Sequence, residues 1–266
     1  MNFCFTKRTI LPYQKIYKFQ STNQSYRVIG KGKPVILLHG SMVNNPWMGF
    51  ENLLAKHYRV YLPDLPGFGA SDSIDGELHD TDLFARALCV FIKETNLTKT
   101  TIIGFSLGTI ISVKTATSGC TQGKLILVGL PGKISGWNFQ LTSHIPVSLR
   151  RLLVSTNFGK AKLLIPILRK NIGKADKTRD AKLLGDLSYT SVQSLVDLDM
   201  RKEIEKDMPY FFSRIKNKVV LIYGENDPLR KTVSHLETKY KTIPRAEHNI
   251  FRTNPEETLK VLINLI

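Results

Sequence analysis

Apolar and polar positions follow a regular order along most of the chain, and this order predicts alternating strands and helices. Short runs rich in β-branched and aromatic residues predict strands at 35–38, 58–62, 100–103, 124–128, 218–223 and 240–243. Apolar residues at helical spacing predict helices at 46–57, 80–95, 107–118 and 254–265. Such alternation predicts an α/β protein with a mostly parallel sheet and helices on both faces.

The alternation stops between Gly129 and about Tyr210. Apolar residues recur there at helical spacing among basic ones over 145–172, and the spacing continues over 181–200. We therefore expect an α-helical lid at 131–210, inserted after the strand at 124–128. The core is then formed by 1–130 and 211–266.

Length and composition are those of one folded domain with a sizeable core. The chain has 266 residues, of which 42% are hydrophobic, and no internal repeat. No apolar run reaches the ~18 residues of a transmembrane helix. The first twenty residues are basic and acid-free, as in an organelle transit peptide, but they contain few serines and arginines. We expect a short leading strand there and a cytoplasmic protein.

Cysteine usage is sparse. Cys4, Cys89 and Cys120 are odd in number and lack C-x-x-C spacing, which argues against a disulfide framework and against a zinc site. A reducing compartment fits this pattern best. Cys89 is expected to be a small buried apolar side chain.

The positive charge is unevenly distributed. The formal net charge is +16, residues 1–50 carry no acidic side chain, and residues 141–180 hold many Lys and Arg against only Asp176 and Asp180. Known nucleic-acid-binding signatures are missing, so no nucleic-acid partner is expected. For the basic lid two interpretations stay open. It is a cap packed through its apolar stripe, or a surface that contacts anionic membrane or an anionic substrate.

The run Gly-Phe-Ser-Leu-Gly at 104–108 is the strongest chemical signal. It lies between the predicted strand at 100–103 and the predicted helix at 107–118. A sharp turn between strand and helix exposes the hydroxyl of Ser106, and flanking residues without Cβ allow the two elements to approach closely. Ser106 is therefore a candidate nucleophile.

Four further motifs follow predicted strands in a fixed order. They are Leu-Leu-His-Gly-Ser at 37–41, Pro-Asp-Leu-Pro-Gly-Phe-Gly-Ala-Ser at 63–71, Tyr-Gly-Glu-Asn-Asp at 223–227 and Ala-Glu-His-Asn at 246–249. Together with Ser106 they resemble the α/β-hydrolase superfamily from about Lys33 to the C-terminus. The resemblance implies an eight-stranded sheet that opens with a hairpin at 13–19 and 25–30. It also implies a lid after the sixth strand.

The resemblance implies a catalytic triad in the order nucleophile, acid, histidine. Ser106 corresponds to the nucleophile, Asp227 to the acid and His248 to the base. Asp227 has the alternative use of capping a helix before Pro228, and Glu225 is the reserve acid.

Three other positions of the motifs have supporting roles in this interpretation. His39 competes with His248 as the base but is expected to prop its own loop. Asp64 is expected to fix the loop at 66–69. The remaining histidines are expected on the solvated surface: His57, His79, His144 and His235.

Backbone amides are expected to stabilise the oxyanion, one from Leu107 and one from Ser41 or, alternatively, Met42. Side chains expected near the substrate are those of Met42, Trp47, Phe105, Trp137 and Phe139. Two departures leave the subfamily open. The histidine motif has Glu247 in place of the commoner glycine, and the helix after the nucleophile continues with Thr109 and Ile110.

A serine nucleophile implies acyl chemistry, whereas an aspartate would imply dehalogenase or epoxide hydrolase chemistry. We expect hydrolysis of a small or medium carboxylic ester. Cleavage of a carbon–carbon bond and acyl transfer use the same residues, and a catalytically silent binding module is the alternative of another class. No metal cluster, P-loop or G-x-G-x-x-G motif occurs, so neither a metal nor a cofactor is expected.

Overall fold

Eight strands form one sheet in the computed structural model, which describes residues 14–41, 47–132, 145–156, 162, 190–191, 194, 197, 202–236 and 240–266. The strand order is β1-β2-β4-β3-β5-β6-β7-β8. The strands are β1 (Gln14–Phe19), β2 (Thr22–Ile29), β3 (Pro34–Leu38), β4 (Arg59–Pro63), β5 (Thr101–Phe105), β6 (Leu125–Val128), β7 (Val219–Gly224) and β8 (Tyr240–Ile243).

The sheet is mostly parallel, as predicted. The strands β4, β3, β5, β6, β7 and β8 are each parallel to their neighbours in this series, and only β1 and β2 introduce antiparallel pairs. The turn between β1 and β2 has positive φ at both Gln20 and Ser21, at 46° and 63°. A two-residue turn with this handedness matches the twist of the flanking strands, so the hairpin is closed tightly.

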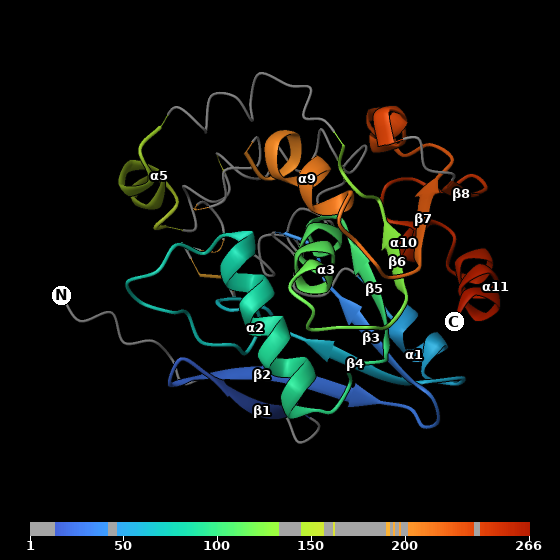
Figure 1. Cartoon of the computed structure of the whole chain (residues 1–266), viewed down its shortest axis with the longest axis horizontal. Helices are drawn as coiled ribbons and strands as arrows, with labels where there is room; N and C mark the ends of the chain where they lie inside the picture. Colours follow the sequence, from blue (N-terminus) through green and yellow to red (C-terminus); the bar gives the residue numbers. More distant parts are fainter. Residues whose placement is uncertain are drawn as a thin grey trace.

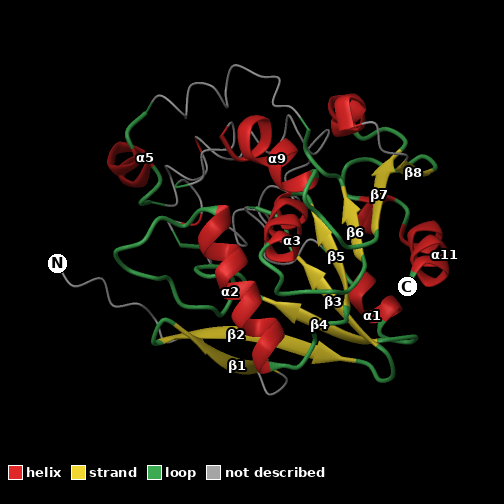
Figure 2. Cartoon of the chain, in the orientation of Figure 1, coloured by secondary structure: helices red, strands yellow, loops and turns green. Residues whose placement is uncertain are grey.

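Helices cover both faces of the sheet (Figures 1 and 2). One face carries α2 (Thr81–Glu94), α3 (Leu107–Thr117) and α9 (Met208–Phe212), and the other carries α1 (Phe50–Leu54), α10 (Ile250–Thr253) and α11 (Pro255–Leu265). Side chains of the central strands alternate between the two faces. In β6, for example, Leu127 packs on the side of α2 and α3, and Val128 packs on the side of α1 and α11. The apolar runs without polar alternation thus correspond to strands that are buried on both faces.

Helix ends follow the local signals in the sequence. The side chain of Asp80 caps α2 by accepting a hydrogen bond from the amide of Leu83 at 2.9 Å. Asn254 caps α11 in the same way through the amide of Glu257, with Pro255 in the first turn. Both caps are the first residues of the helices predicted at 80–95 and 254–265, and Asp, Asn and a following Pro are typical of helix starts.

Within the expected lid, the described elements are α5 (Val147–Leu153) and the π-helical turn η1 (Lys202–Asp207), which leads into α9. Of the two interpretations of the lid, a cap packed through its apolar stripe does not hold for α5, and contact with membrane or an anionic substrate stays untested. Leu149, Leu152 and Leu153 expose 44%, 67% and 43% of their surface. Most of the other residues expected to form lid helices lie outside the described residues, so the lid and its boundaries stay predictions.

Cys89 and Cys120 form a disulfide, with their Cα atoms 5.3 Å apart. This corrects the expectation that no disulfide forms and that Cys89 is a buried apolar thiol. Because α2 and α3 pack side by side and the chain turns at Gly119 with a φ of 76°, Cys120 reaches back to α2. An odd cysteine count does not prevent one well-placed pair. The argument for a reducing compartment that rested on this count no longer holds.

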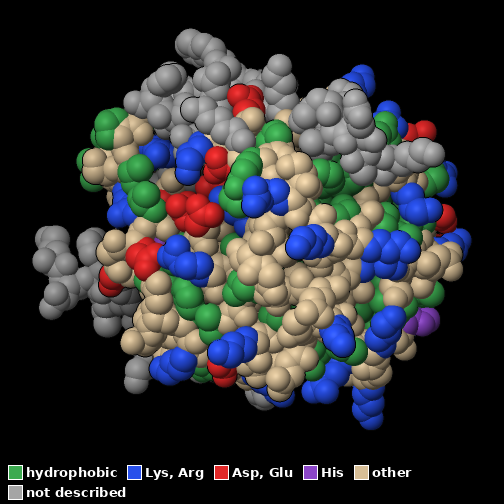
Figure 3. Space-filling model, in the orientation of Figure 1, with side chains coloured by type: hydrophobic (Ala, Val, Ile, Leu, Met, Phe, Trp, Pro, Cys, Tyr) green, Lys and Arg blue, Asp and Glu red, His purple; other side chains and the backbone are tan. Residues whose placement is uncertain are grey.

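Lys and Arg side chains are spread over the face shown in Figure 3, in keeping with the net charge of +16. Among the described residues, no helix combines the length and the apolar character that a bilayer crossing requires.

Candidate active site

Ser106 lies at the junction of β5 and α3 in a strained backbone conformation. Its φ and ψ are 51° and −117°, and a positive φ is uncommon for a residue with a side chain. A Cβ on Gly104 would lie 2.6 Å from the carbonyl oxygen of Gly108, and one on Gly108 would lie 2.5 Å from that of Leu38. The two glycines are therefore required by close backbone approach, as the motif predicts.

The His-Gly turn after β3 lies directly beside the nucleophile. A Cβ on Gly40 would be 3.1 Å from the Cβ of Ser106. His39 fixes this turn, because its Nε2 accepts a hydrogen bond from the amide of Leu65 at 3.0 Å and its Nδ1 lies 2.8 Å from the carbonyl oxygen of Gly40. Burial lowers the pKa of His39 to about 4, which keeps the ring neutral near pH 7. His39 thus props its loop, as expected.

Asp227 and His248 come together from the ends of β7 and β8. Nδ1 of His248 lies 3.0 Å from Oδ2 of Asp227, whose side chain is fully buried. The other carboxylate oxygen accepts the amide of Leu229 at 2.9 Å. The two oxygens of Asp227 therefore have different partners, and its role as the catalytic acid stays a prediction. One oxygen caps the 3₁₀ helix η2 (Pro228–Leu236), and the other binds the imidazole.

The structure describes two of the five side chains that are expected at the pocket, and these two lie in different surroundings. The ring of Phe105 lies 5.1 Å from that of His248, so the residue before Ser106 contacts the imidazole. Trp47 is 1% exposed and packs on Phe105 and Phe251 in the core. Met42, Trp137 and Phe139 lie outside the described residues, and the substrate contacts of all five stay predictions.

The secondary acids have structural partners. Glu225 is exposed, and its carboxylate accepts the amide of Arg245 at 2.7 Å. Asp64 is buried and accepts the amide of Ala70 at 3.1 Å, which fixes the Pro-Gly-Phe-Gly loop as predicted. In these two hydrogen bonds the acids bind backbone amides, whereas the carboxylate that contacts His248 is that of Asp227.

Of the histidines expected on the surface, His57 is exposed, and His144 and the side chain of His235 lie outside the described residues. For His79 the prediction is wrong, because it is completely buried. Its Nδ1 lies 2.6 Å from Oγ of Ser194, and Nε2 accepts the amide of Ile74 at 3.1 Å. Burial lowers the pKa of His79 below its ordinary value. Ser194 and Asp197, which are far from His79 in the sequence, cover it. The polar residues next to His79 in the sequence therefore do not indicate that it is buried.

The residues expected to supply oxyanion amides flank the nucleophile in the structure. Leu107 is the first residue of α3, where backbone N–H groups are free of helical acceptors and the helix dipole favours negative charge. Ser41 follows the Gly40 that packs on Ser106. Their role as donors stays a prediction.

Gly129 is a candidate functional residue that the sequence motifs missed. It follows β6 with a φ of 66°, and a Cβ there would lie 2.7 Å from Cε1 and 2.9 Å from Nδ1 of His248. The same atom would be 3.4 Å from Oδ2 of Asp227. The available signal was a glycine directly after a strand, which acquires meaning only when β7 and β8 place the imidazole against it.

Gly129→Ala is expected to displace the imidazole and to lower kcat by roughly 10²-fold, since a shift of about 1 Å in a reacting group has effects of this size. Steady-state kinetics with a chromogenic ester measure the change. Gly76→Ala is the matched control. Gly76 also has a positive φ, of 81°, but a Cβ there meets nothing within 4 Å. Equal activity of the two variants would show that the space at Gly129 is not needed by the imidazole.

Among the described residues, no group of three or more His, Cys, Asp or Glu side chains could hold a metal ion. The expected absence of a cofactor stays a prediction.

Comparison with known proteins gives concordant results. A sequence model of the alpha/beta hydrolase family matches residues 35–261. A pimeloyl-[acyl-carrier protein] methyl ester esterase of Aeromonas salmonicida is 24% identical over 259 residues, covering 88% of this chain and 95% of that protein. A 2-hydroxy-6-oxo-6-(2'-aminophenyl)hexa-2,4-dienoic acid hydrolase of Metapseudomonas resinovorans is 36% identical over 267 residues, covering 91% and 86%. The solved structure of a thermophilic esterase from Thermogutta terrifontis superposes with a TM-score of 0.74 at 18% identity, covering 95% and 97%.

Proposed function

The chain belongs to the alpha/beta hydrolase family, and within that family of enzymes we propose that it is a serine hydrolase of small or medium carboxylic esters. The observation that carries the proposal is the pair formed by the buried Asp227 and the half-buried His248, whose side chains lie 3.0 Å apart beside the strained turn at Ser106. Phe105 links the two parts, because it precedes the serine and its ring contacts the imidazole.

The proposed reaction proceeds through an acyl-enzyme. Nε2 of His248 takes the proton of Ser106 as Oγ attacks the ester carbonyl carbon, and the amides of Leu107 and Ser41 stabilise the oxyanion. The imidazolium, held by Asp227, then protonates the leaving alcohol as the carbon–oxygen bond breaks. Water activated by the same imidazole hydrolyses the acyl-enzyme, so that the carboxylic acid is released and Ser106 regains its proton.

Carbon–carbon bond hydrolysis is the second candidate. It is favoured by the 36% identity to the hexa-2,4-dienoic acid hydrolase over 91% of the chain. Acyl transfer to an acceptor other than water would use the same residues. A silent binding module would keep the fold without turnover.

Two further features of the proposal concern the surroundings of the enzyme. We keep a cytoplasmic location as the prediction, although the Cys89–Cys120 bond is of a kind that persists mainly in oxidising compartments. The basic segment at 141–180 is a candidate contact for anionic membrane, but most of it lies outside the described residues.

A fluorophosphonate probe, which phosphonylates activated serines, is expected to label the protein at Ser106. Mass spectrometry of the labelled peptide identifies the site, and heat-unfolded protein serves as the control for nonspecific labelling. p-Nitrophenyl esters of increasing chain length then define the acyl group, and a vinylogous 1,5-diketone acid tests carbon–carbon cleavage. Absence of labelling together with absence of turnover on both substrate classes would favour a binding module.

A further inference from the structure

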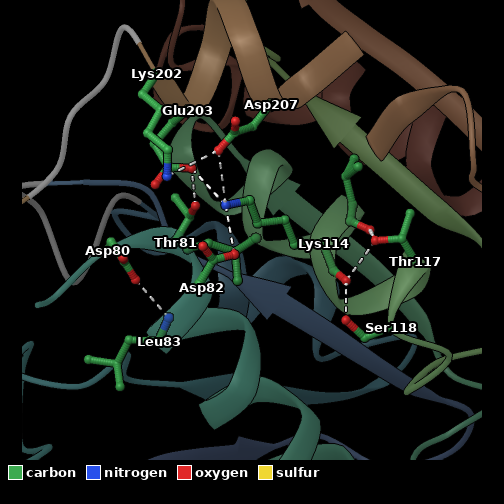
Figure 4. Close-up of polar contacts among 12 residues, drawn as sticks. Asp80, Thr81, Asp82, Leu83, Lys114, Thr117, Ser118, Lys202, Glu203 and Asp207 are labelled. Atoms are coloured by element: carbon green, nitrogen blue, oxygen red, sulfur yellow. Dashed lines mark hydrogen bonds and ion pairs between the residues drawn. The ribbon is translucent and has the colours of Figure 1, made fainter. Parts of the chain in front are cut away.

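A buried lysine lies on α3, the helix that begins at the nucleophile. The side chain of Lys114 is 3% exposed, although a charge without partners is unfavourable in the interior. Its Nζ lies 2.8 Å from Oδ1 of Asp82, 2.8 Å from Oε2 of Glu203 and 3.8 Å from Oδ2 of Asp207 (Figure 4). Lys114 thus joins α3 to α2 and to η1, and the mechanism proposed above does not use it.

Glu203 is the most buried partner in this cluster, with 2% of its side chain exposed. Its Oε2 also accepts a hydrogen bond from the hydroxyl of Thr81 (Figure 4). Thr81 and Asp82 form the first turn of α2. The start of η1 is therefore held by one charged and one neutral donor from two different helices.

A second buried cluster surrounds His79, which lies immediately before the first turn of α2. The backbone amide of His79 donates to Oδ2 of Asp197 at 3.0 Å, and the His79 ring contacts Ser194. Asp197 has a fully buried side chain and accepts two hydrogen bonds from Arg151, at 2.8 and 2.5 Å. Nε2 of His79 lies 3.1 Å from the amide nitrogen and 3.2 Å from the carbonyl oxygen of Ile74, and Nδ1 lies 2.6 Å from Oγ of Ser194, so both ring nitrogens have polar partners.

Two parts of the chain between β6 and β7 therefore contact the start of α2 and Lys114. Ser194 and Asp197 contact His79, and Glu203 contacts both Thr81 and Lys114. Arg151 and Asp207 support these contacts, because Arg151 binds Asp197 and Asp207 lies near Lys114. We name His79, Thr81 and Asp82, together with Lys114, the α2 seat. In the sequence these contacts are 46 to 122 residues apart, and no motif marks them.

The segment held by the α2 seat is also joined to the candidate active site. It leaves the sheet at Gly129, which packs against His248. On its return, Ile204 and Met208 pack in the same apolar cluster as Leu107. The described residues that follow the seat thus pack in the same apolar layer as the start of α3, close to the candidate site.

We propose that Lys114 is a positioning residue for the hydrolase, and that the α2 seat holds Asp197 and η1 in one register beside the start of α3, so that substrate binds with full affinity. An apolar contact between α3 and η1 would tolerate several registers, whereas one buried ammonium group shared by three carboxylates selects a single one. The seat therefore acts on substrate binding, and the bond-making residues are left in place. This inference rests on the proposed function for its kinetic part only.

The test compares wild type with Lys114→Met/Glu203→Gln. Lys114→Met alone leaves Glu203 buried beside a neutral side chain and endangers folding, whereas the double variant removes both charges and keeps the partner of Thr81. The expected result is a KM for a p-nitrophenyl ester raised roughly tenfold with kcat changed less than about twofold, the signature of lost binding. Lys260→Met is the matched control, because Lys260 forms an ion pair with Glu257 but is 72% exposed.

Hydrogen–deuterium exchange supplies a readout that needs no activity. Amides of residues 202–212, in η1 and α9, are expected to exchange about tenfold faster in the double variant, while those of β3, β5 and β6 stay protected. Wild-type exchange in a folded double variant, or an unchanged KM in an enzyme that the fluorophosphonate probe labels, would overturn the role of the seat. Faster exchange in a protein that the probe does not label would support the seat and reject the proposed function instead.

Discussion

Ser106→Ala is expected to abolish ester hydrolysis and to leave the fold unchanged. Loss of a triad nucleophile lowers kcat by roughly 10⁴-fold or more, because the remaining groups can only assist direct attack by water. The backbone strain at Ser106, with its φ of 51°, is the same for alanine, and the Cβ that lies next to Gly40 is retained. The melting temperature should therefore stay within about 2 °C of wild type, a shift that corresponds to less than roughly 1 kcal/mol.

Steady-state kinetics and a thermal melt of the same preparation check this result. Ser118→Ala is the matched control, since Ser118 caps the opposite end of α3 and donates to the carbonyl oxygen of Lys114. It should retain turnover and fluorophosphonate labelling, both of which Ser106→Ala loses. Residual activity above a few per cent of wild type in Ser106→Ala would transfer the nucleophile role to another residue.

The strands and helices of the core were predictable because local pattern and final environment agree. The central strands are buried on both faces, so they appear as continuous apolar runs such as Ile126 and Leu127, and their bounds differ from prediction by one or two residues. Asp80 and Asn254 signal helix starts through their own side chains. The turn at Gly104 and Gly108 requires small residues for a local steric reason.

Features that depend on distant segments were not predictable. His79 follows a polar stretch and was expected on the surface, but Ser194 and Asp197 bury it from more than 100 residues away. The Cys89–Cys120 bond depends on how α2 packs against α3. Gly129 gains its role only from the imidazole that approaches it. In each case the sequence specifies the residue, while the partner is specified by the assembly of the sheet and its helices.

The acid and the base are expected to act as one unit with Ser106. Asp227→Asn offers a specific test because of how the carboxylate is held. Oδ1 accepts the amide of Leu229 at 2.9 Å, so the oxygen of the asparagine must occupy that position and its NH₂ group must face Nδ1 of His248. A donor at that place forces the imidazole proton onto Nε2, and the ring can no longer accept the proton of Ser106.

We therefore expect Asp227→Asn to lower kcat by roughly 10²- to 10⁴-fold and His248→Ala by about 10⁴-fold or more. The double variant should be no more than about threefold slower than His248→Ala, because an orienting carboxylate has no function once the imidazole is gone. Glu225→Gln is the control, since that exposed carboxylate binds the amide of Arg245 and should be dispensable. If Asp227→Asn kept full activity while Glu225→Gln lost it, Glu225 would be the acid. If the two triad losses instead multiplied in the double variant, His248 and Asp227 would act at independent steps.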